Sequence, residues 1–326
     1  MSAPSPSPSQ RTTPTPSATP DPVAGWVELT VTAGPPARED HTWTVDDSGA
    51  SAYLFGGRDG AVVLDDLWAY DLATDVWRRL EPAGDRPPGR FGHNAVWSDE
   101  HGLVLFAGQA GPSTFFNDLW AYDPEADTWR ALSASGEVPI SRYGSCAALD
   151  AAGALWISHG FTSDGTRFDD TRRYDFDSGA WTDATPAGRL PIARCLHACW
   201  FTDDGALTLY AGQTTGVQAL GDRWTLTSGE SWAADDGELP APRNLPATAR
   251  WAGGTVVFGG QGADGAFLDD AWQLIDDGAA AAIDARGPAG RAGAELVADP
   301  ERGRLLLFAG MDAAGSRADL WELALP

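Results

Sequence analysis

The sequence predicts an all-β fold, a six-bladed β-propeller made of four-stranded antiparallel blades. Three observations predict it: a recurring segment about 50 residues long, short strand-like runs within each copy, and an N-terminal run that supplies a strand missing from the last copy. Each copy opens with an Arg, and successive copies are 52, 52, 52, 49 and 48 positions apart. The copies begin at Arg38, Arg90, Arg142, Arg194, Arg243 and Arg291.

Each repeat contains four short runs that alternate with turn residues. In the second repeat these runs are residues 93–97, 103–108, 117–123 and 128–133. Runs of this length, rich in Val, Leu, Phe, Tyr and Trp and bounded by Gly, Pro, Asp and Asn, are typical of antiparallel strands. Four such strands form one blade, whose faces pack on the neighbouring blades. This packing accounts for the 15 Trp without any function, and Trp120 is expected to be buried in it.

The two ends of the repeat region complement each other. The last repeat ends after its third run, at Leu320 to Leu323, whereas residues 25–29 read as a fourth strand with no repeat of their own. Trp26 precedes Arg38 by 12 residues, and the corresponding spacing in other repeats is 11 to 13. We therefore expect the N-terminal strand to complete the sixth blade and close the ring, which removes the exposed sheet edges. The predicted propeller domain is 25–326.

Residues 1–24 are rich in Ser, Thr, Pro and Ala, which predicts a disordered, extended tether. No apolar signal-peptide segment follows Met1. Two locations stay open: a secreted or lipoprotein-anchored protein at the cell surface, whose export signal is absent from the printed sequence, or a cytoplasmic protein with a disordered tail. The three Cys do not choose between them, because an odd and sparse set is no disulfide framework.

The composition argues against two classes of partner. The chain has 46 acidic and 22 basic residues, and every basic residue is Arg. Because nucleic acids are held by clustered Lys and Arg, and the chain has no basic run, we expect no nucleic-acid partner. No apolar stretch reaches the roughly 18 residues that span a bilayer, so we expect no membrane insertion of the propeller. We expect an acidic monomer.

The repeats resemble those of the kelch family. Each carries an apolar run that ends in two small residues, and spaced aromatic residues follow. The Gly-Gly pair is intact at Gly56-Gly57 and Gly259-Gly260, becomes Ala-Gly in three repeats, and is His159-Gly160 in the third. The resemblance covers about residues 25–326 and implies a six-bladed propeller like the kelch and galactose-oxidase-like propellers. Most kelch propellers are binding platforms and a minority are enzymes, so the fold transfers better than the function.

The resemblance also implies where a ligand binds. In kelch-like propellers, the residues that follow the small pair and the repeat Arg line one mouth of the central channel. The first set is Arg58, Gln109, Phe161, Gln213, Gln261 and Met311, and the second is Glu39, Asp40, Phe91, Tyr143 and Asn244. Such amides and aromatic rings suit peptide loops or sugars. We expect non-catalytic binding of a protein or carbohydrate there. The alternative is a galactose-oxidase-like or epimerase-like enzyme acting on a sugar in the channel.

Three His share one repeat position, three residues after the repeat Arg: His41, His93 and His197. One interpretation is a metal site on the channel axis. The favoured interpretation is that each His makes local hydrogen bonds, as unligated His side chains usually do. Blades one, two and four are unevenly spaced around the axis, which argues against a compact metal site. No catalytic residue is predicted. No cofactor is predicted either; the alternative is a bound metal, either Ca²⁺ at the Asp-Gly loops or a transition metal.

Three further motifs are interpreted without a ligand. Cys195 and Cys199 would lie about 13 Å apart on one strand, too far to share a zinc ion, so both are predicted to be buried free thiols. Residues 260–265 match G-x-G-x-x-G but precede another strand, which excludes a dinucleotide site. Tyr143 and Cys146 suggest a copper-radical centre, although no complete set of its residues can be placed. The third repeat breaks the pattern twice, at His159 and Arg172.

Overall fold

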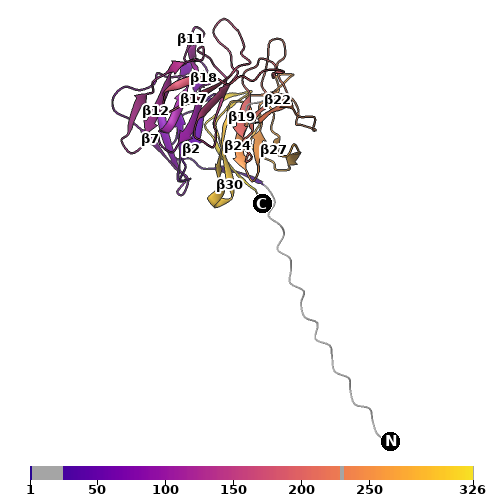
Figure 1. Cartoon of the computed structure of the whole chain (residues 1–326). Coiled ribbons are helices and arrows are strands. Elements are labelled where there is room, and N and C mark those ends of the chain that lie inside the picture. The colour runs from indigo at the N-terminus through magenta and orange to yellow at the C-terminus, as the bar shows by residue number, and fades with distance from the viewer. Residues whose placement is uncertain (2–24, 228–230, 326) are drawn as a thin grey trace.

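The computed structural model describes residues 1, 25–227 and 231–325, so the predicted tether lies almost wholly outside the described residues. The predicted fold class is confirmed. Six antiparallel sheets are arranged around a central axis (Figure 1). The first strand of each sheet is the innermost, since it contacts the first strands of neighbouring sheets. Among the described residues, no helix is long and apolar enough to cross a membrane.

Each sheet adds its strands from the axis outward. The first sheet is β2 (Thr42–Val45), β3 (Ser51–Phe55), β6 (Leu67–Asp71) and β7 (Val76–Leu80). The second is β8 (Asn94–Ser98), β9 (Gly102–Phe106), β12 (Leu119–Asp123) and β13 (Thr128–Ala131). The third is β15 (Cys146–Leu149), β16 (Leu155–Ser158), β17 (Thr171–Asp175) and β18 (Ala180–Asp183), with β14 (Ser135–Gly136) parallel to β18 at the outer edge.

The remaining sheets follow the same plan. The fourth is β19 (Ala198–Phe201), β20 (Leu207–Tyr210), β21 (Arg223–Thr227) and β22 (Ser231–Ala234). The fifth is β24 (Ala247–Trp251), β25 (Gly254–Phe258), β27 (Ala271–Ile275) and β28 (Ala280–Ile283). The sixth is β29 (Glu295–Asp299), β30 (Arg304–Phe308), β33 (Leu320–Ala324) and β1 (Gly25–Leu29), with η1 (Pro300–Arg302) between its first two strands.

Short strands pair in the loops at one end of the sheets. They are β4 (Arg58–Asp59), β5 (Val62–Val63), β10 (Gln109–Gly111), β11 (Thr114–Phe115), β23 (Arg243–Asn244), β26 (Gln261–Gly262), β31 (Met311–Asp312) and β32 (Gly315–Ser316). Within the G-x-G-x-x-G segment, β26 is followed by a turn and then by β27. The prediction that a strand rather than a helix follows this motif is confirmed.

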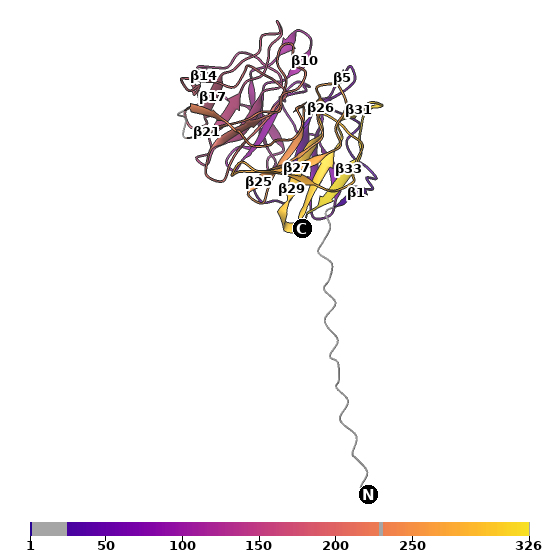
Figure 2. The same ribbon diagram turned by 90° about the vertical axis from the view of Figure 1, so that its right-hand side faces the viewer.

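The N-terminal strand is the outermost strand of the sixth sheet. β1 pairs with β33 along its whole length, from Gly25 opposite Ala324 to Leu29 opposite Leu320. The two strands lie side by side in Figure 2. The first and last strands of the chain therefore meet within one blade, and the pairing buries Trp26 against Phe258 of the fifth sheet, at 5.0 Å between ring centroids.

The aromatic core lies between adjacent blades. Trp181, on the outer strand of the third sheet, is 1% exposed and contacts Phe106 of the second sheet at 5.0 Å. Trp43 and Trp77 of the first sheet contact Phe308 of the sixth in the same way. The prediction that Trp120 is buried holds only in part: Trp120 is half-buried and packs against the core between the first and second blades. Its indole N–H has a different role, because it donates to Asp118 Oδ2 at 2.8 Å.

That aspartate belongs to an ion pair that recurs in every blade. In the second repeat, Arg90 donates from Nη1 and Nη2 to the two carboxylate oxygens of Asp118, at 2.7 and 2.9 Å. Nη1 also donates to the Ala107 carbonyl at 2.9 Å. The equivalent pairs are Arg38–Asp66, Arg142–Asp170, Arg194–Asp222, Arg243–Asp270 and Arg291–Asp319. Each pair fixes the loop before an inner strand to the small-residue pair of the same blade.

The third repeat keeps this arrangement despite its irregular sequence. Arg172 stands where other repeats have Trp, and its Nε donates to Asp170 Oδ2 at 3.0 Å. Its guanidinium thus replaces the indole N–H as the second donor. The departure at Arg172 therefore conserves the local hydrogen bonds.

We predict that Arg90→Ala lowers the free energy of unfolding by about 2–4 kcal/mol, because it leaves a carboxylate and a buried carbonyl without their donor. The value lies below that of a fully buried pair, since the Asp118 side chain is 37% exposed. Arg86→Ala is the matched control. It removes an exposed Arg86–Asp65 pair of the preceding blade and should cost less than about 1 kcal/mol. Urea denaturation measures both, and equal losses would contradict the prediction.

Candidate functional site

A closed ring of backbone hydrogen bonds surrounds the channel axis. It is formed by the six residues that lie two positions after each repeat Arg, all with φ between 50° and 63°. Each N–H donates to the carbonyl oxygen of the equivalent residue in the preceding blade, at 2.8–3.2 Å. The donors and acceptors run Asp40 to Gly293, Gly293 to Leu245, Leu245 to Leu196, Leu196 to Gly144, Gly144 to Gly92, and Gly92 to Asp40. This hydrogen-bond ring fixes the position of all six inner strands around the channel.

Crowding explains the choice of residues in the ring. A Cβ at Gly92 would lie 1.9 Å from the ring of Tyr143, and one at Gly144 would lie 2.7 Å from Leu196 Cδ2. At both positions the next blade fills the space with a large side chain. Glycine also adopts a positive φ at no steric cost, and aspartate tolerates it. The same reasoning applies to Gly293, where a Cβ would lie 2.6 Å from Asp40 Oδ1.

The structure brings the predicted mouth residues together on one side of the ring. The residue after each repeat Arg forms a backbone bridge with the residue after the small pair. The bridges are Glu39 with Arg58, Phe91 with Gln109, Tyr143 with Phe161, Cys195 with Gln213, Asn244 with Gln261, and Ala292 with Met311. Asp40 belongs to the hydrogen-bond ring itself. The predicted residues that follow the small pair are half-exposed, whereas those that follow the Arg are buried.

Two buried carboxylates form the centre of this layer. Arg58 approaches Glu39 Oε1 with Nε at 3.2 Å and Asp40 Oδ2 with Nη2 at 3.3 Å. The Tyr143 hydroxyl donates to the same Asp40 oxygen at 2.8 Å, from two blades away. Burial and the charge of Asp40 raise the pKa of Glu39 to about 7. Burial also raises the pKa of Asp40, although Arg58 and Tyr143 oppose that change. Arg58 and Tyr143 therefore support the buried carboxylates as well as lining the mouth.

An aromatic and basic surface lies beside these carboxylates. Phe161 is half-exposed, and its ring contacts those of Tyr143 and Phe115 at 5.1 and 5.8 Å. The Arg167 guanidinium lies 5.8 Å from the centre of the Phe161 ring. We call Phe115, Phe161 and Arg167 the mouth patch. The sequence analysis missed Phe115 and Arg167, because it followed only positions adjacent to the repeat signals, and both residues come from the loops beyond them.

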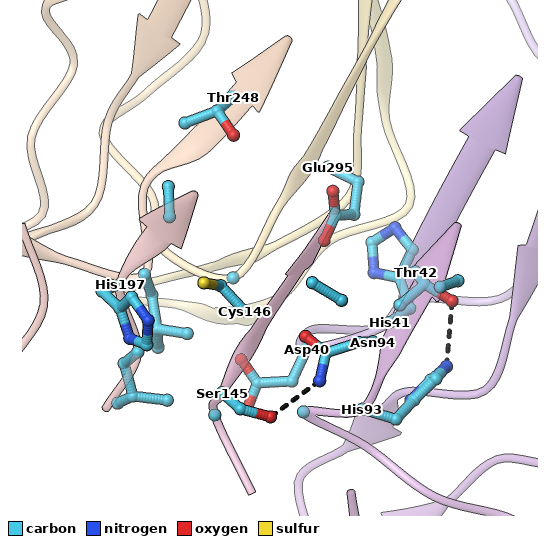
Figure 3. A pocket seen from close by; sticks show the side chains of 18 of the residues that line it. Asp40, His41, Thr42, His93, Asn94, Ser145, Cys146, His197, Thr248 and Glu295 are labelled. Carbon is cyan, nitrogen blue, oxygen red and sulfur yellow. Dashed lines mark hydrogen bonds between the residues drawn. The ribbon is translucent and has the colours of Figure 1, made fainter. Parts of the chain in front are cut away.

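A cavity of about 190 Å³ lies on the other side of the hydrogen-bond ring, between the inner strands. Of the eleven predicted mouth residues, only Asp40 lines it. The polar side chains around it include those of Asp40, His41, Asn94, Ser145, Thr248 and Glu295 (Figure 3). The mouth and this channel cavity are therefore separate places, divided by the ring.

The three predicted His all line the channel cavity and are buried. Only His93 has a side-chain partner in the described part of the chain: its Nε2 lies 2.9 Å from Thr42 Oγ1. Burial holds the pKa of His41, His93 and His197 well below its ordinary value, so the rings are neutral. Within residues 25–227 and 231–325, no group of three or more His, Cys, Asp or Glu is placed to hold a metal ion.

The prediction of two free thiols was wrong for Cys199. Cys199 forms a disulfide with Cys146, with a Cα–Cα distance of 5.7 Å, whereas Cys195 is free and buried. The sequence argument considered only distances along one strand. The inner strands β15 and β19 lie side by side, so they bring together two Cys that are 53 residues apart.

These features define a repeat propeller with a loop-lined mouth. A family model described as the KLHDC2/KLHL20/DRC7 Kelch-repeats domain matches residues 24–212, which is more than half of the chain. The chain belongs to the kelch-repeat family, and the predicted resemblance is confirmed.

Curated relatives include three plant and animal proteins. Adagio-like protein 3 of Oryza sativa is 31% identical over 60% of this chain, and F-box/kelch-repeat protein At1g51550 of Arabidopsis thaliana is 27% identical over 68%. The leucine-zipper-like transcriptional regulator 1 homolog of Drosophila melanogaster is 29% identical over 58%. The matched regions cover 31%, 51% and 20% of these relatives, so the chain spans about half of their length or less.

We predict that Glu295→Gln raises the melting temperature at pH 9 but not at pH 4. Burial, with the charge of Asp40, raises the pKa of Glu295 to about 8 in the folded protein. Since the unfolded chain ionises near pH 4.5, rising pH favours unfolding from about 4.5 up to 8. The amide variant lacks this penalty. Calorimetry at several pH values measures the difference, with the exposed Glu301→Gln as control. A difference independent of pH would contradict the prediction.

Proposed function

We propose that this propeller is a non-catalytic binding module whose protein partner docks on the mouth patch. The observation that carries the proposal is the half-exposed Phe161, flanked by Phe115 and Arg167 at the loop-lined end of the channel. Aromatic rings and Arg are the residues that most often dominate the energy of protein interfaces. Kelch propellers typically act as protein-interaction modules, which supports the same conclusion.

The chemistry of the mouth favours a short loop or peptide with one apolar group and one carboxylate. Phe115 and Phe161 offer an apolar surface for the first group. Arg167 lies beside them, and its guanidinium can donate two parallel hydrogen bonds to a carboxylate. The net charge of −24 on the whole chain disfavours strongly acidic partners at long range, so the carboxylate would be a local feature of a partner that is otherwise neutral or basic.

Two alternatives stay in view. The half-exposed amides of Gln109, Gln213 and Gln261 surround the mouth, and an aromatic ring beside amides also suits a carbohydrate. The enzyme alternative in its copper-radical form would need the sulfur of Cys146 to crosslink to a tyrosine. That sulfur is bonded to Cys199. Of the two alternatives, carbohydrate binding is therefore better supported than a copper-radical enzyme.

Peptides selected from a random library on the wild-type protein are expected to lose at least tenfold in affinity for Phe161→Ala, since truncating a central aromatic residue costs about 2 kcal/mol or more. The control is Phe176→Ala. Phe176 is another half-buried phenylalanine, but it follows the end of β17 that is remote from the mouth. Titration calorimetry measures both. Arg58→Ala and Tyr143→Ala are poorer probes, because both side chains contact the buried carboxylates.

Selected peptides that bind Phe161→Ala as tightly as wild type would contradict docking at the mouth patch. Glycans that bind when no peptide does, and that lose affinity on the same substitution, would favour the carbohydrate alternative over the protein one.

We also propose that the protein works outside the reducing cytosol, at the cell surface or secreted. The Cys146–Cys199 disulfide supports this, since disulfides persist in oxidising compartments. Alkylation in denaturant without reductant, on protein taken directly from its native cells, should label Cys195 only. Cys195 is thus an internal control, because it is the free thiol. Labelling of all three Cys would contradict export.

A further inference from the structure

We propose that the channel cavity binds a small primary ammonium group between Asp40 and Glu295. This site lies on the opposite side of the hydrogen-bond ring from the mouth patch, and it does not depend on the proposed function. The ligand class is a small amine in its protonated form, or the amino end of a longer molecule that enters the channel.

The charges around the axis leave a negative surplus once Glu39 and Glu295 ionise, since their pKa values are about 7 and 8. Glu39, Asp40 and Glu295 are three carboxylates, and Arg58 is the cation that contacts two of them. The six repeat Arg do not compensate for this surplus, because each is paired with the Asp of its own blade. A buried charge is costly unless it is paired, so this cluster favours a bound cation.

Unpartnered acceptors also line the cavity. The Asp40 side chain is 0% exposed, and its Oδ1 has no hydrogen-bond partner among the described residues, whereas Oδ2 is bound by Tyr143. His41 is 2% exposed, and neither of its ring nitrogens has a partner there. The Glu295 carboxylate lies across the cavity, between the inner strands (Figure 3). These groups offer a carboxylate oxygen, an imidazole nitrogen and a second carboxylate to the same space.

This set of acceptors fits an ammonium group. A primary ammonium has three N–H donors and no acceptor, so it can donate to Asp40 Oδ1 and to the Glu295 carboxylate and keep a third N–H for another acceptor of the cavity. A buried acceptor left without a donor is costly, and a bound ammonium would supply the donor that Asp40 Oδ1 lacks among the described residues. The volume of about 190 Å³ is below that of most drug-sized sites, so it suits a molecule of a few heavy atoms.

A metal ion fits less well. No group of three or more His, Cys, Asp or Glu within 25–227 and 231–325 has the arrangement that a metal needs. Calcium takes six to eight oxygen ligands, and the two carboxylates are far short of this number. The neutral hydrogen-bonding groups of Asn94 and Ser145 are already joined to each other at 2.7 Å.

Methylammonium chloride is the probe, titrated into the full chain by calorimetry in amine-free buffer at about pH 8.5, where an amine with a pKa of about 10.4 is still protonated. Tetramethylammonium has the same charge but no N–H donor. We expect methylammonium to bind and tetramethylammonium not to bind. Glu295→Gln should weaken methylammonium binding about tenfold or more, as expected for loss of a hydrogen bond to a charged group.

Matched variants separate this site from a general charge effect and from the mouth. Glu301→Gln removes the same charge from an exposed position and should leave the affinity unchanged. Asp40→Asn keeps a residue that tolerates the positive φ and should also weaken binding. The peptide titration at the mouth and the methylammonium titration at the cavity are separate measurements on the wild-type protein, so failure of the mouth proposal would be distinguishable from failure of this one.

Three results would overturn the proposal. The first is no methylammonium binding to wild type, and the second is equal binding by wild type and Glu295→Gln. The third is equal binding of tetramethylammonium, which would show that charge alone attracts the cation. Tight binding of Ca²⁺ or Zn²⁺, lost in the same variants, would replace the ammonium group with a metal.

Discussion

Six buried guanidinium groups hold the start of each inner strand against its own blade. Each guanidinium, such as that of Arg90, joins a carboxylate on the third strand to a carbonyl at the small-residue pair. The loop is thereby fixed just before the residue that enters the hydrogen-bond ring. This constraint helps to give the six positive-φ residues a common position around the axis, where their backbone groups close the ring. The mouth and the channel cavity both depend on that closure.

The hydrogen-bond ring separates two parts of the channel that are lined by different kinds of side chain. On one side are half-exposed rings, amides and Arg167, which suit contact with another molecule's surface. On the other side are Asp40, the half-buried Glu295 and neutral imidazoles, which suit a small enclosed ligand. Asp40 belongs to both sides: Oδ2 faces Tyr143 and Arg58, and Oδ1 has no partner in the part of the chain that the structure describes. A single side chain thus couples the two environments.

The sequence predicts the features that recur in every repeat, but it does not predict individual contacts between side chains of different repeats. The blade number, the strands and the closing role of residues 25–29 follow from spacing alone. The mouth residues follow from their place beside the repeat signals. By contrast, the Cys146–Cys199 disulfide and the contact of Tyr143 with Asp40 join different blades, and no spacing reports them. Phe115 and Arg167 lie at one repeat position, six residues beyond Gln109 and Phe161, and each bridges back to that residue, a correspondence that the sequence analysis did not use. The hydrogen bond from the indole of Trp120 to Asp118 is likewise not revealed by composition.

The disulfide and the pairing of β1 with β33 lie at opposite sides of the circle of blades. The first joins the third and fourth blades covalently, and the second completes the sixth blade through backbone hydrogen bonds and the packing of Trp26, with no covalent link. Beside the second, Arg304 contacts Asp75 across the boundary between the sixth and first blades. We therefore expect a pulling force on the two ends to open the circle at the sixth blade before it separates the third blade from the fourth. The Cys146–Cys199 disulfide would still hold the third and fourth blades together, so that β1 and β33 stay close enough to pair again.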